Sequence, residues 1–373
     1  MIEIGEKKIH ERYMKMAIKL AKKGIGLVNP NPPVGAVIVK EGKVISAGYH
    51  KKYGGYHAER NAILSAWSKG IALNGATMYV TLEPCDHYGK TPPCTDLIIE
   101  AGIKQVYVAC KDPNPVSGNG IEKLKKNGIE VHVGILESEA RELAKFFFKS
   151  VESGIPYVTL KYAATLDGKI ADSSSNSKWI TNELRNVVHK LRHAHMAVLV
   201  GARTVLVDNP MLNVRLNGKY KDPVKIILDK NGSVFDRLFN HLNDLNAFRS
   251  GKVIVFTERD LPDDVISNFS HVKVYKESEP LQILRVLHDL EGIDSILLEG
   301  GATIFSQFLP YADEIYGFYG LNIFGKGLGT FEYVTRYVTE KLDFSIQKVF
   351  VAKNRREFAV VMRRVYRDNS KSC

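Results

Sequence analysis

The chain lacks any long run of hydrophobic residues. Its longest apolar stretches, such as 196–202, are far shorter than the roughly 20 residues that a membrane-spanning helix needs. The N-terminal segment MIEIGEKKIHER has no apolar core followed by a small-residue cleavage site, so it does not resemble a secretory signal. Cysteine is scarce, with four in 373 residues, which is typical of proteins whose thiols stay reduced. We therefore expect a cytoplasmic protein without membrane contact.

The chain also lacks an arginine-rich block, an RNA-binding signature and internal repeats. Lysine and arginine give a net charge of +11 and a pI near 9.2, but they are spread along the whole chain. A basic surface attracts nucleic acid, anionic lipid or phosphorylated metabolites, and it is about as often only a solvated surface. Charge alone therefore does not predict a nucleic-acid partner, and we expect none.

The order of predicted elements favours two α/β domains. A chain of 373 residues is longer than one hydrophobic core usually serves. Predicted strands alternate with helices up to a helix over 137–150, and after SGIP at 153–156 the pattern restarts with a strand at 157–162. Segments near 341–350 and 356–365 should pair as a hairpin. We therefore predict domains at 1–152 and 153–373.

Two cysteines lie in the stretch EPCDHYGKTPPC, which covers residues 83–94. Cys85 and Cys94 have eight residues between them, and a proline precedes each. His57 lies upstream in the tripeptide HAE. A catalytic zinc ion takes three nitrogen or sulfur ligands from the protein and keeps a fourth position for water. Each of these residues lies at or just before a predicted helix start, where positive charge favours a thiolate. We predict that His57, Cys85 and Cys94 bind zinc.

Glu59 distinguishes a catalytic zinc site from a structural one. It lies two residues after His57, and neighbours at that spacing do not share a helix face, so Glu59 can stand beside the metal without binding it. A free carboxylate there can take a proton from a water and pass it to a leaving amine. This chemistry suits the hydrolytic deamination of a heterocycle. Taken singly, each residue is equally well explained as a buried thiol, a core histidine or a helix cap. We expect Cys110 to serve packing and Cys373 to be free.

The H-x-E and P-C elements resemble those of the zinc-dependent cytidine-deaminase superfamily, although its general signature ends in C-x2-C and this chain has C-x8-C. HAE, TLEPCDHYGKTPPC and the DPNP of 112–115 together resemble the deaminase half of the bifunctional riboflavin-biosynthesis deaminase/reductases. This resemblance implies that Lys90 holds the ribose phosphate of the substrate. The substrate pocket that it implies consists of Asn31, His50, His87 and Lys90.

The second half lacks the G-x-G-x-x-G fingerprint of dinucleotide-binding domains. The glycine pair after Glu299 permits close approach by a phosphate, but such pairs are more often simple turns. Stretches at 160–171, 177–181, 200–215 and 297–305 resemble the reductase half of the same family, which implies a dihydrofolate-reductase-like fold and NADPH. The implied cofactor contacts are Ala163, Trp179, Thr204, Asp208, Gly301, Ala302, Thr303, Ile304, Phe305, Ser306 and Gln307. The implied substrate contacts are Ser177, Arg192, Leu212, Arg215 and Glu299.

The resemblance further implies a sequence of two reactions. The first half would hydrolyse the 2-amino group of 2,5-diamino-6-(5-phosphoribosylamino)pyrimidin-4(3H)-one, and the second would reduce the ribosyl group to ribityl. Lys161 and Glu299 would supply charge and proton transfer, while Arg192 and Arg215 grip the phosphate. The family also implies a homo-oligomer. Lys230 stands where the family usually has serine or threonine, which leaves the preference for NADPH over NADH open.

Two other interpretations compete with this one. An RNA-editing zinc deaminase with an accessory domain would use the same zinc chemistry on a flipped base, and the net charge of +11 motivates it. A zinc-stabilised binding protein without activity is the second alternative. The reductase-like half argues against the first, and the intact H-x-E argues against the second.

Overall fold

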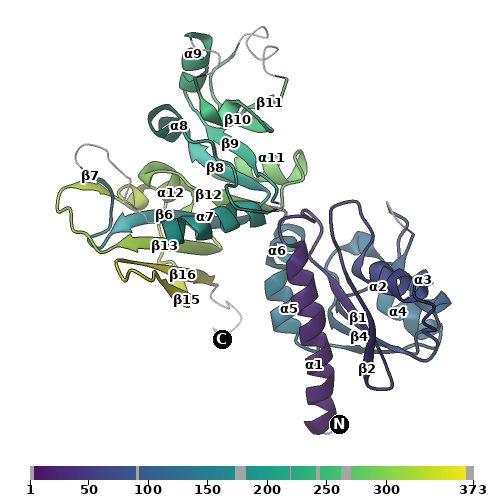
Figure 1. The fold of residues 1–373 in the computed structure, drawn as a ribbon. Coiled ribbons are helices and arrows are strands. Elements are labelled where there is room, and N and C mark those ends of the chain that lie inside the picture. The colour runs from purple at the N-terminus through teal and green to yellow at the C-terminus, as the bar shows by residue number, and fades with distance from the viewer. Residues whose placement is uncertain are drawn as a thin grey trace, which may run out of the picture. The chain divides into compact units, whose positions relative to one another are not determined.

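The computed structural model describes residues 4–89, 92–172, 182–218, 220–240, 244–261 and 270–366. The chain divides into two compact units, Met1–Gly154 and Ile155–Cys373 (Figure 1). Within the described ranges, no helix is both long and apolar enough to cross a membrane.

The first unit is built on a mixed sheet with the strand order β2-β1-β3-β4-β5. Its strands are β1 (Gly35–Lys40), β2 (Lys43–Tyr49), β3 (Thr77–Leu82), β4 (Gln105–Cys110) and β5 (Glu130–Val133). β1 pairs antiparallel with β2 and β3, whereas β3, β4 and β5 run parallel. Glu41 and Gly42 both have positive φ angles, 50° and 70°, which is the turn that a two-residue hairpin between β1 and β2 requires.

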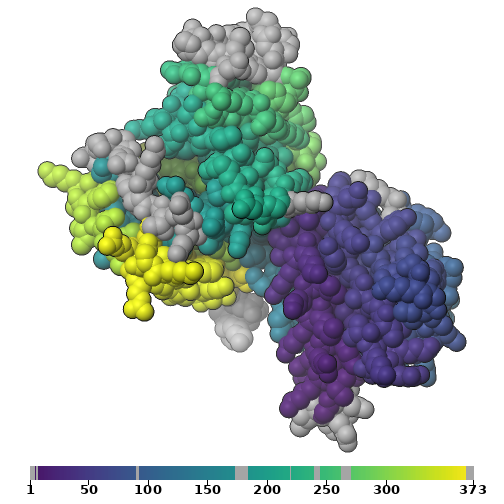
Figure 2. Space-filling view, viewed as in Figure 1, coloured from purple at the N-terminus to yellow at the C-terminus, as the bar shows by residue number. Residues whose placement is uncertain are grey.

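Helices cover both faces of this sheet. They are α1 (Ile4–Ala21), α2 (Ala58–Trp67), α3 (Cys94–Glu100), α4 (Gly120–Lys126), α5 (Glu137–Leu143) and α6 (Lys145–Ser153). One apolar cluster packs α2, α3 and α4 against the sheet, and another packs α1 and α5 against the opposite face. Figure 2 shows α1, in dark purple, on the outside of the unit.

The prediction of a single helix over 137–150 is wrong. Ala144, with φ −102° and ψ 20°, leaves the helical region and separates α5 from α6. After this break, Phe148 is buried in the core cluster under α1, while Phe147 is only partly buried and lines the cavity described below.

The second unit contains a nine-stranded sheet in the order β11-β10-β9-β8-β12-β6-β13-β16-β15. Its strands are β6 (Tyr157–Thr165), β8 (Ala197–Gly201), β9 (Val224–Leu228), β10 (Val253–Thr257), β11 (Val272–Lys276), β12 (Ser295–Leu298), β13 (Glu314–Gly320), β15 (Asp343–Val351) and β16 (Glu357–Val365). The strands from β11 to β13 in this order are parallel, and β16 pairs antiparallel with β13 and β15. The predicted hairpin is confirmed. A small separate ladder joins β7 (Lys169–Asp172) to β14 (Gly327–Gly329).

The parallel strands bring several chain segments to one edge. The helices of this unit are α7 (Asn182–Ala194), α8 (Ala202–Asp208), α9 (Ser233–Asn240), α11 (Pro280–Asp289) and α12 (Ala302–Phe308). Leu199 of β8 joins one apolar cluster and its neighbours Val198 and Val200 join another, so the sheet is covered on both faces. The carboxyl ends of parallel strands lie at a common edge, so Glu299 after β12 shares that edge with Lys230 after β9.

Candidate active sites

The three predicted zinc ligands converge in the first unit. Nδ1 of His57 lies 3.4 Å from Sγ of Cys85 and 3.5 Å from Sγ of Cys94. The three ligand atoms all lie within 4.8 Å of one another, which is the spacing of a metal cluster. The Cys94 thiol next to the Cys85 sulfur lowers the pKa of Cys85, and the same contact raises that of Cys94. Two thiols that share one proton in this way fit a soft divalent cation in its place.

Helix starts position two of these ligands. His57 is the N-cap of α2, and Cys94 is the first residue of α3. Gly48 on β2 fixes the start of α2, because a Cβ atom there would lie only 2.5 Å from the carbonyl oxygen of Ala58. The helix therefore lies directly against the strand, and only glycine permits that approach.

Glu59 is buried beside the triad and does not belong to it. Only 3% of its surface is exposed, and its Oε2 atom has no hydrogen-bond partner among the residues that the structure describes. Burial raises the pKa of Glu59 to about 7. A buried carboxylate oxygen without a hydrogen bond is costly for stability, and such groups are typical of sites where a proton moves.

A cavity of about 260 Å³ is lined by His57 and Cys85 of the cluster and by Glu59. Three of the four residues predicted for the substrate pocket line it, namely Asn31, His50 and His87. His50 Nδ1 lies 3.0 Å from the carbonyl oxygen of Tyr56, and its Nε2 lies 3.4 Å from the Asn31 amide nitrogen. Burial lowers the pKa of His50, so the ring stays neutral and can hold Asn31 by accepting its hydrogen bond. The fourth predicted residue, Lys90, lies outside the described residues.

Sequence reasoning did not select several residues that line this cavity. Asp112, Asn114, Ser117 and Phe147 are among them. Burial raises the pKa of Asp112 to about 6. The available signal was the DPNP motif directly after the β4 strand, since polar residues at strand ends often form sites. Phe147 carried no such signal, because an aromatic residue on a helix usually belongs to the core.

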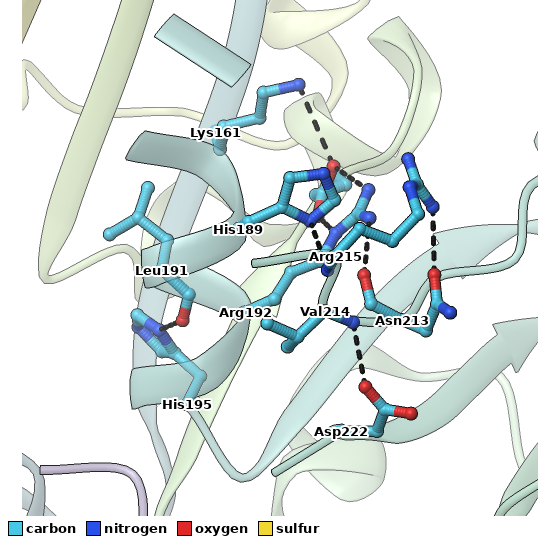
Figure 3. Close-up of polar contacts among 10 residues, drawn as sticks. Lys161, His189, Leu191, Arg192, His195, Asn213, Val214, Arg215 and Asp222 are labelled. Atoms are coloured by element: carbon cyan, nitrogen blue, oxygen red, sulfur yellow. Dashed lines mark hydrogen bonds and ion pairs between the residues drawn. The ribbon is translucent and has the colours of Figure 1, made fainter. Parts of the chain in front are cut away.

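In the second unit, Lys161 and Arg192 converge on Glu299. Figure 3 shows Lys161, Arg192 and Arg215 at this site. Arg192 donates to both carboxylate oxygens, with Nε 2.6 Å from Oε1 and Nη2 3.0 Å from Oε2. Lys161 Nζ lies 3.7 Å from Oε2. Burial opposes ionisation of Glu299, yet Arg192 and Lys161 lower its pKa to about 2. Burial also lowers the pKa of Lys161. Glu299 is therefore a fixed negative charge beside a largely buried lysine whose pKa is lowered.

The spacing of apolar residues along α7 explains why Arg192 is buried. Leu184, Val188 and Leu191 of α7 are buried at helical intervals and fix the face that packs on the sheet. Arg192 follows Leu191 at the edge of this face and is only 9% exposed. His189, one turn earlier on α7, accepts the backbone N–H of Arg215 at 3.3 Å.

Arg215, the second arginine of this site, lies in the loop after α8. Arg215 Nη1 donates to the Asn213 side chain at 2.8 Å, and Arg192 Nη1 donates to the Asn213 carbonyl oxygen at 3.0 Å. Leu212 is buried and has a φ angle of 54°, which is uncommon for leucine and costly in conformational energy. Strained residues cluster at functional sites, and this one fixes the course of the loop that brings Arg215 to Arg192.

The predicted cofactor contacts differ in how deeply their side chains are buried. Ala302, Phe305 and Ser306 of α12 are buried in the core, whereas Thr303 is exposed and Gly301, Ile304 and Gln307 are partly exposed. A Cβ atom on Gly301 would meet nothing within 4 Å, so open space lies over this backbone. Ala163 and Thr204 are partly exposed, and Asp208 is exposed at the end of α8. Ser177 and Trp179 lie outside the described residues.

Comparison with known families matches both units. Residues 7–110 match the family described as the cytidine and deoxycytidylate deaminase zinc-binding region. Residues 156–325 match the RibD C-terminal domain.

Known proteins resemble the chain over nearly its whole length. It is 45% identical to the riboflavin biosynthesis protein RibD of Aquifex aeolicus over 359 residues, which are 92% of this chain and 96% of that one. It is 37% identical to RibD of Escherichia coli over 315 residues, 80% of this chain and 83% of that one. The chain belongs to the RibD family of riboflavin biosynthesis proteins.

A solved RibD-type structure agrees with this membership. The diaminohydroxyphosphoribosylaminopyrimidine deaminase/5-amino-6-(5-phosphoribosylamino)uracil reductase of Thermotoga maritima is 49% identical, with a TM-score of 0.87 over 96% of this chain and 99% of that one. The chain is thus a bifunctional deaminase and reductase of riboflavin biosynthesis, and the expected α/β class with a cytidine-deaminase-like first domain is confirmed. The zinc expectation is confirmed as well. The dihydrofolate-reductase-like description of the second domain stays a prediction.

Proposed function

We propose that domain 1–152 removes the 2-amino group of 2,5-diamino-6-(5-phosphoribosylamino)pyrimidin-4(3H)-one. Domain 153–373 then reduces the ribosyl group of the resulting 5-amino-6-(5-phosphoribosylamino)uracil to ribityl. The observation that carries this proposal is the unpaired Glu59 carboxylate beside a three-ligand metal cluster, in a chain that also holds the Lys161–Glu299 pair. The Thermotoga maritima neighbour is named for both activities.

His57, Cys85 and Cys94 would hold the zinc ion in the first domain. Zinc, when bound, supplies a water whose pKa is lowered toward neutrality. Glu59 Oε2 takes up a proton in the cavity and delivers it to the leaving amine, because this buried oxygen has no hydrogen-bond partner among the described residues. Asn31, held by neutral His50, offers hydrogen bonds that orient the pyrimidine ring.

The open backbone at Gly301 and the partly exposed Thr204 would hold NADPH in the second domain, together with the other predicted cofactor contacts. NADPH, when bound, supplies the hydride for the ribosyl C1 carbon. Lys161 is the proton-carrying group, because it is largely buried at the site with Nζ 3.7 Å from Glu299 Oε2. Glu299 stays ionised and stabilises the positive charge that develops when a ribosylamine opens to an imine. Arg215 is the more exposed arginine of the pair and grips the substrate phosphate.

Consumption of NADPH after addition of the diaminopyrimidine phosphate tests both reactions and their order. Wild type should consume NADPH with either pyrimidine. Glu59→Gln should consume it only with the deaminated uracil, because the amide cannot carry the proton. Failure of zinc-loaded wild type to release ammonia or to oxidise NADPH with either compound contradicts the proposal.

The proposed partners are the phosphorylated pyrimidine and further copies of this chain. We place the enzyme in the cytoplasm, where both substrates and reduced thiols are found. Size-exclusion chromatography with light scattering checks the homo-oligomer, and a monomer at micromolar concentration contradicts it.

A further inference from the structure

A polar network joins the two cysteine-bearing segments behind the zinc cluster. Asp86 follows Cys85 directly, and Thr95 follows Cys94. The Thr95 hydroxyl donates to Asp86 Oδ1 at 3.0 Å. Lys123 of α4 places Nζ 2.6 Å from the same Oδ1 atom.

Lys123 also reaches the second cysteine segment by itself. Its Nζ atom lies 2.6 Å from Oδ1 of Asp96, in the first turn of α3. One ammonium group therefore bridges two carboxylates, one on each segment. Without it, Asp86 and Asp96 would be two negative charges facing one another, and like charges so placed push their segments apart.

The backbone around α4 fixes where Lys123 can reach. A Cβ atom on Gly120, the first residue of α4, would lie 1.8 Å from the carbonyl oxygen of Pro84, so the helix start is pressed against the segment before Cys85. Glu83 Oε1 accepts the N–H of Ile121 at 3.0 Å, and the Ser117 carbonyl oxygen accepts the N–H of Asp86 at 2.8 Å. These contacts fix α4 against the Cys85 segment. The side chains of Lys123 and Thr95 then connect this segment to the Cys94 segment.

We propose that Lys123 and Thr95 are positioning residues that act through Asp86 to hold the Cys85 and Cys94 sulfur atoms at the separation that zinc requires. This inference rests on the proposed zinc site. The side-chain contacts of Lys123 and Thr95 described above reach Asp86 and Asp96 rather than the ligand atoms themselves. Both act on residues adjacent in the chain to a ligand, and loss of such outer partners typically weakens metal binding by about 10–100-fold.

The size of the change in zinc affinity distinguishes a positioning role from a purely structural one. The side chains of Lys123, Asp86 and Asp96 are 31%, 22% and 43% exposed. Ion pairs with this degree of exposure contribute little to folding, so a purely structural role predicts small changes in every measurement. A positioning role instead predicts a large change in zinc affinity with little change in the stability of the metal-free protein.

The test compares zinc affinity in the full chain, measured by competition with a chromogenic chelator, for wild type, Lys123→Met and Thr95→Val. Lys126→Met is the matched control, because Lys126 is exposed on the same helix. We expect Lys123→Met to weaken zinc binding about 10-fold or more and Lys126→Met to leave it unchanged. The Co²⁺-substituted protein should show an altered ligand-field spectrum in Lys123→Met and in Thr95→Val but not in Lys126→Met. Thermal unfolding of the metal-free forms should not separate Lys123→Met from its control.

A double substitution sharpens the inference. Lys123→Met and Thr95→Val both act on Asp86, so their combined loss of zinc affinity should be smaller than the product of the single losses. Zinc affinity in Lys123→Met equal to that in Lys126→Met overturns the inference, whether or not Thr95→Val folds. Failure of wild type itself to bind one zinc per chain instead overturns the proposed zinc site, so the two failures are distinguishable.

Discussion

Glu59 and Glu299 are both buried glutamates, yet their surroundings are opposite. Glu59 has an oxygen without any partner and a pKa raised to about 7. Glu299 accepts two hydrogen bonds from Arg192, lies near Lys161 and has a pKa of about 2. Burial opposes ionisation in both, so the difference comes from the cationic partners. The carboxylate that we propose as the proton carrier thus has an oxygen without a hydrogen bond among the described residues, whereas the one that we propose stays charged lies between two cations.

The two sites also differ in how the chain assembles them. The zinc ligands and Glu59 come from loop ends and helix starts within one stretch of the first unit. Lys161, Arg192 and Glu299 come from β6, α7 and the end of β12, which are distant in sequence. The first arrangement leaves a motif whose residue types and spacing themselves predict the chemistry. The second leaves only separate stretches, such as 160–171 and 297–305, whose chemistry is implied by their resemblance to the family.

The largest expected effect comes from replacing each glutamate by its amide. Glu59→Gln should lower deaminase turnover by about 10²–10⁴-fold, because the proton carrier is lost. Its reductase turnover, measured with the deaminated uracil, should be unchanged. Glu299→Gln is the matched control and should show the reverse pattern, with a smaller loss because only a charge is removed. Equal loss of deaminase turnover in both variants contradicts the distinction between the two carboxylates.

Removal of its cationic partner should make Glu299 resemble Glu59. Arg192→Met leaves a buried carboxylate without its hydrogen bonds and should destabilise the protein by about 3–5 kcal/mol. Urea unfolding measures this loss, and Arg185→Met, exposed on the same helix, is the control. Adding Glu299→Gln to Arg192→Met should restore part of the stability, because the unpaired charge is gone. A loss no larger than that of Arg185→Met argues against a buried ion pair.

Asp112 extends the comparison to the pH dependence of stability. Its folded pKa of about 6 lies above the usual value of 3.8, so the folded state favours the protonated form. This contribution is complete below pH 3.8 and is lost as the pH rises through 6. Asp112→Asn should therefore be more stable than wild type by about 2–3 kcal/mol at pH 7 and equal to it near pH 4. Urea unfolding at both pH values checks this, and a difference that does not change with pH contradicts it.

Lys230 should show the smallest effect. Its side chain is 68% exposed and pairs with Glu258 at 3.2 Å, and exposed pairs contribute about 0–1 kcal/mol. Lys230→Ser should therefore change the NADPH dissociation constant by less than about 5-fold, with NADH binding as the control. Calorimetric titration measures both. A tenfold loss for NADPH alone would show that Lys230 binds the 2′-phosphate.

Local sequence patterns account for some elements of the fold and leave others unexplained. The hairpin of β1 and β2 was readable because the Glu41-Gly42 turn and the alternating flanks agree. β13 (Glu314–Gly320) was not predicted, because its glycines and tyrosines do not form the apolar pattern of a buried strand. Its pairing with β6 and β16 stabilises it as a strand. The short helices α8, α9 and α12 were missed for the same reason, since tertiary packing stabilises them more than their own propensity.

The sequence by itself determined the zinc chemistry, because three ligands and a free carboxylate at fixed spacing leave few other interpretations. It also indicated both halves of the bifunctional enzyme, because short stretches in each half resemble the family's motifs. Only the tertiary structure decided that Arg192 clamps Glu299, that Phe147 and Asp112 reach the deaminase cavity, and that Lys123 bridges the two cysteine segments. The physical reason is that charge pairing and burial depend on distances between segments far apart in the chain, which no local pattern records.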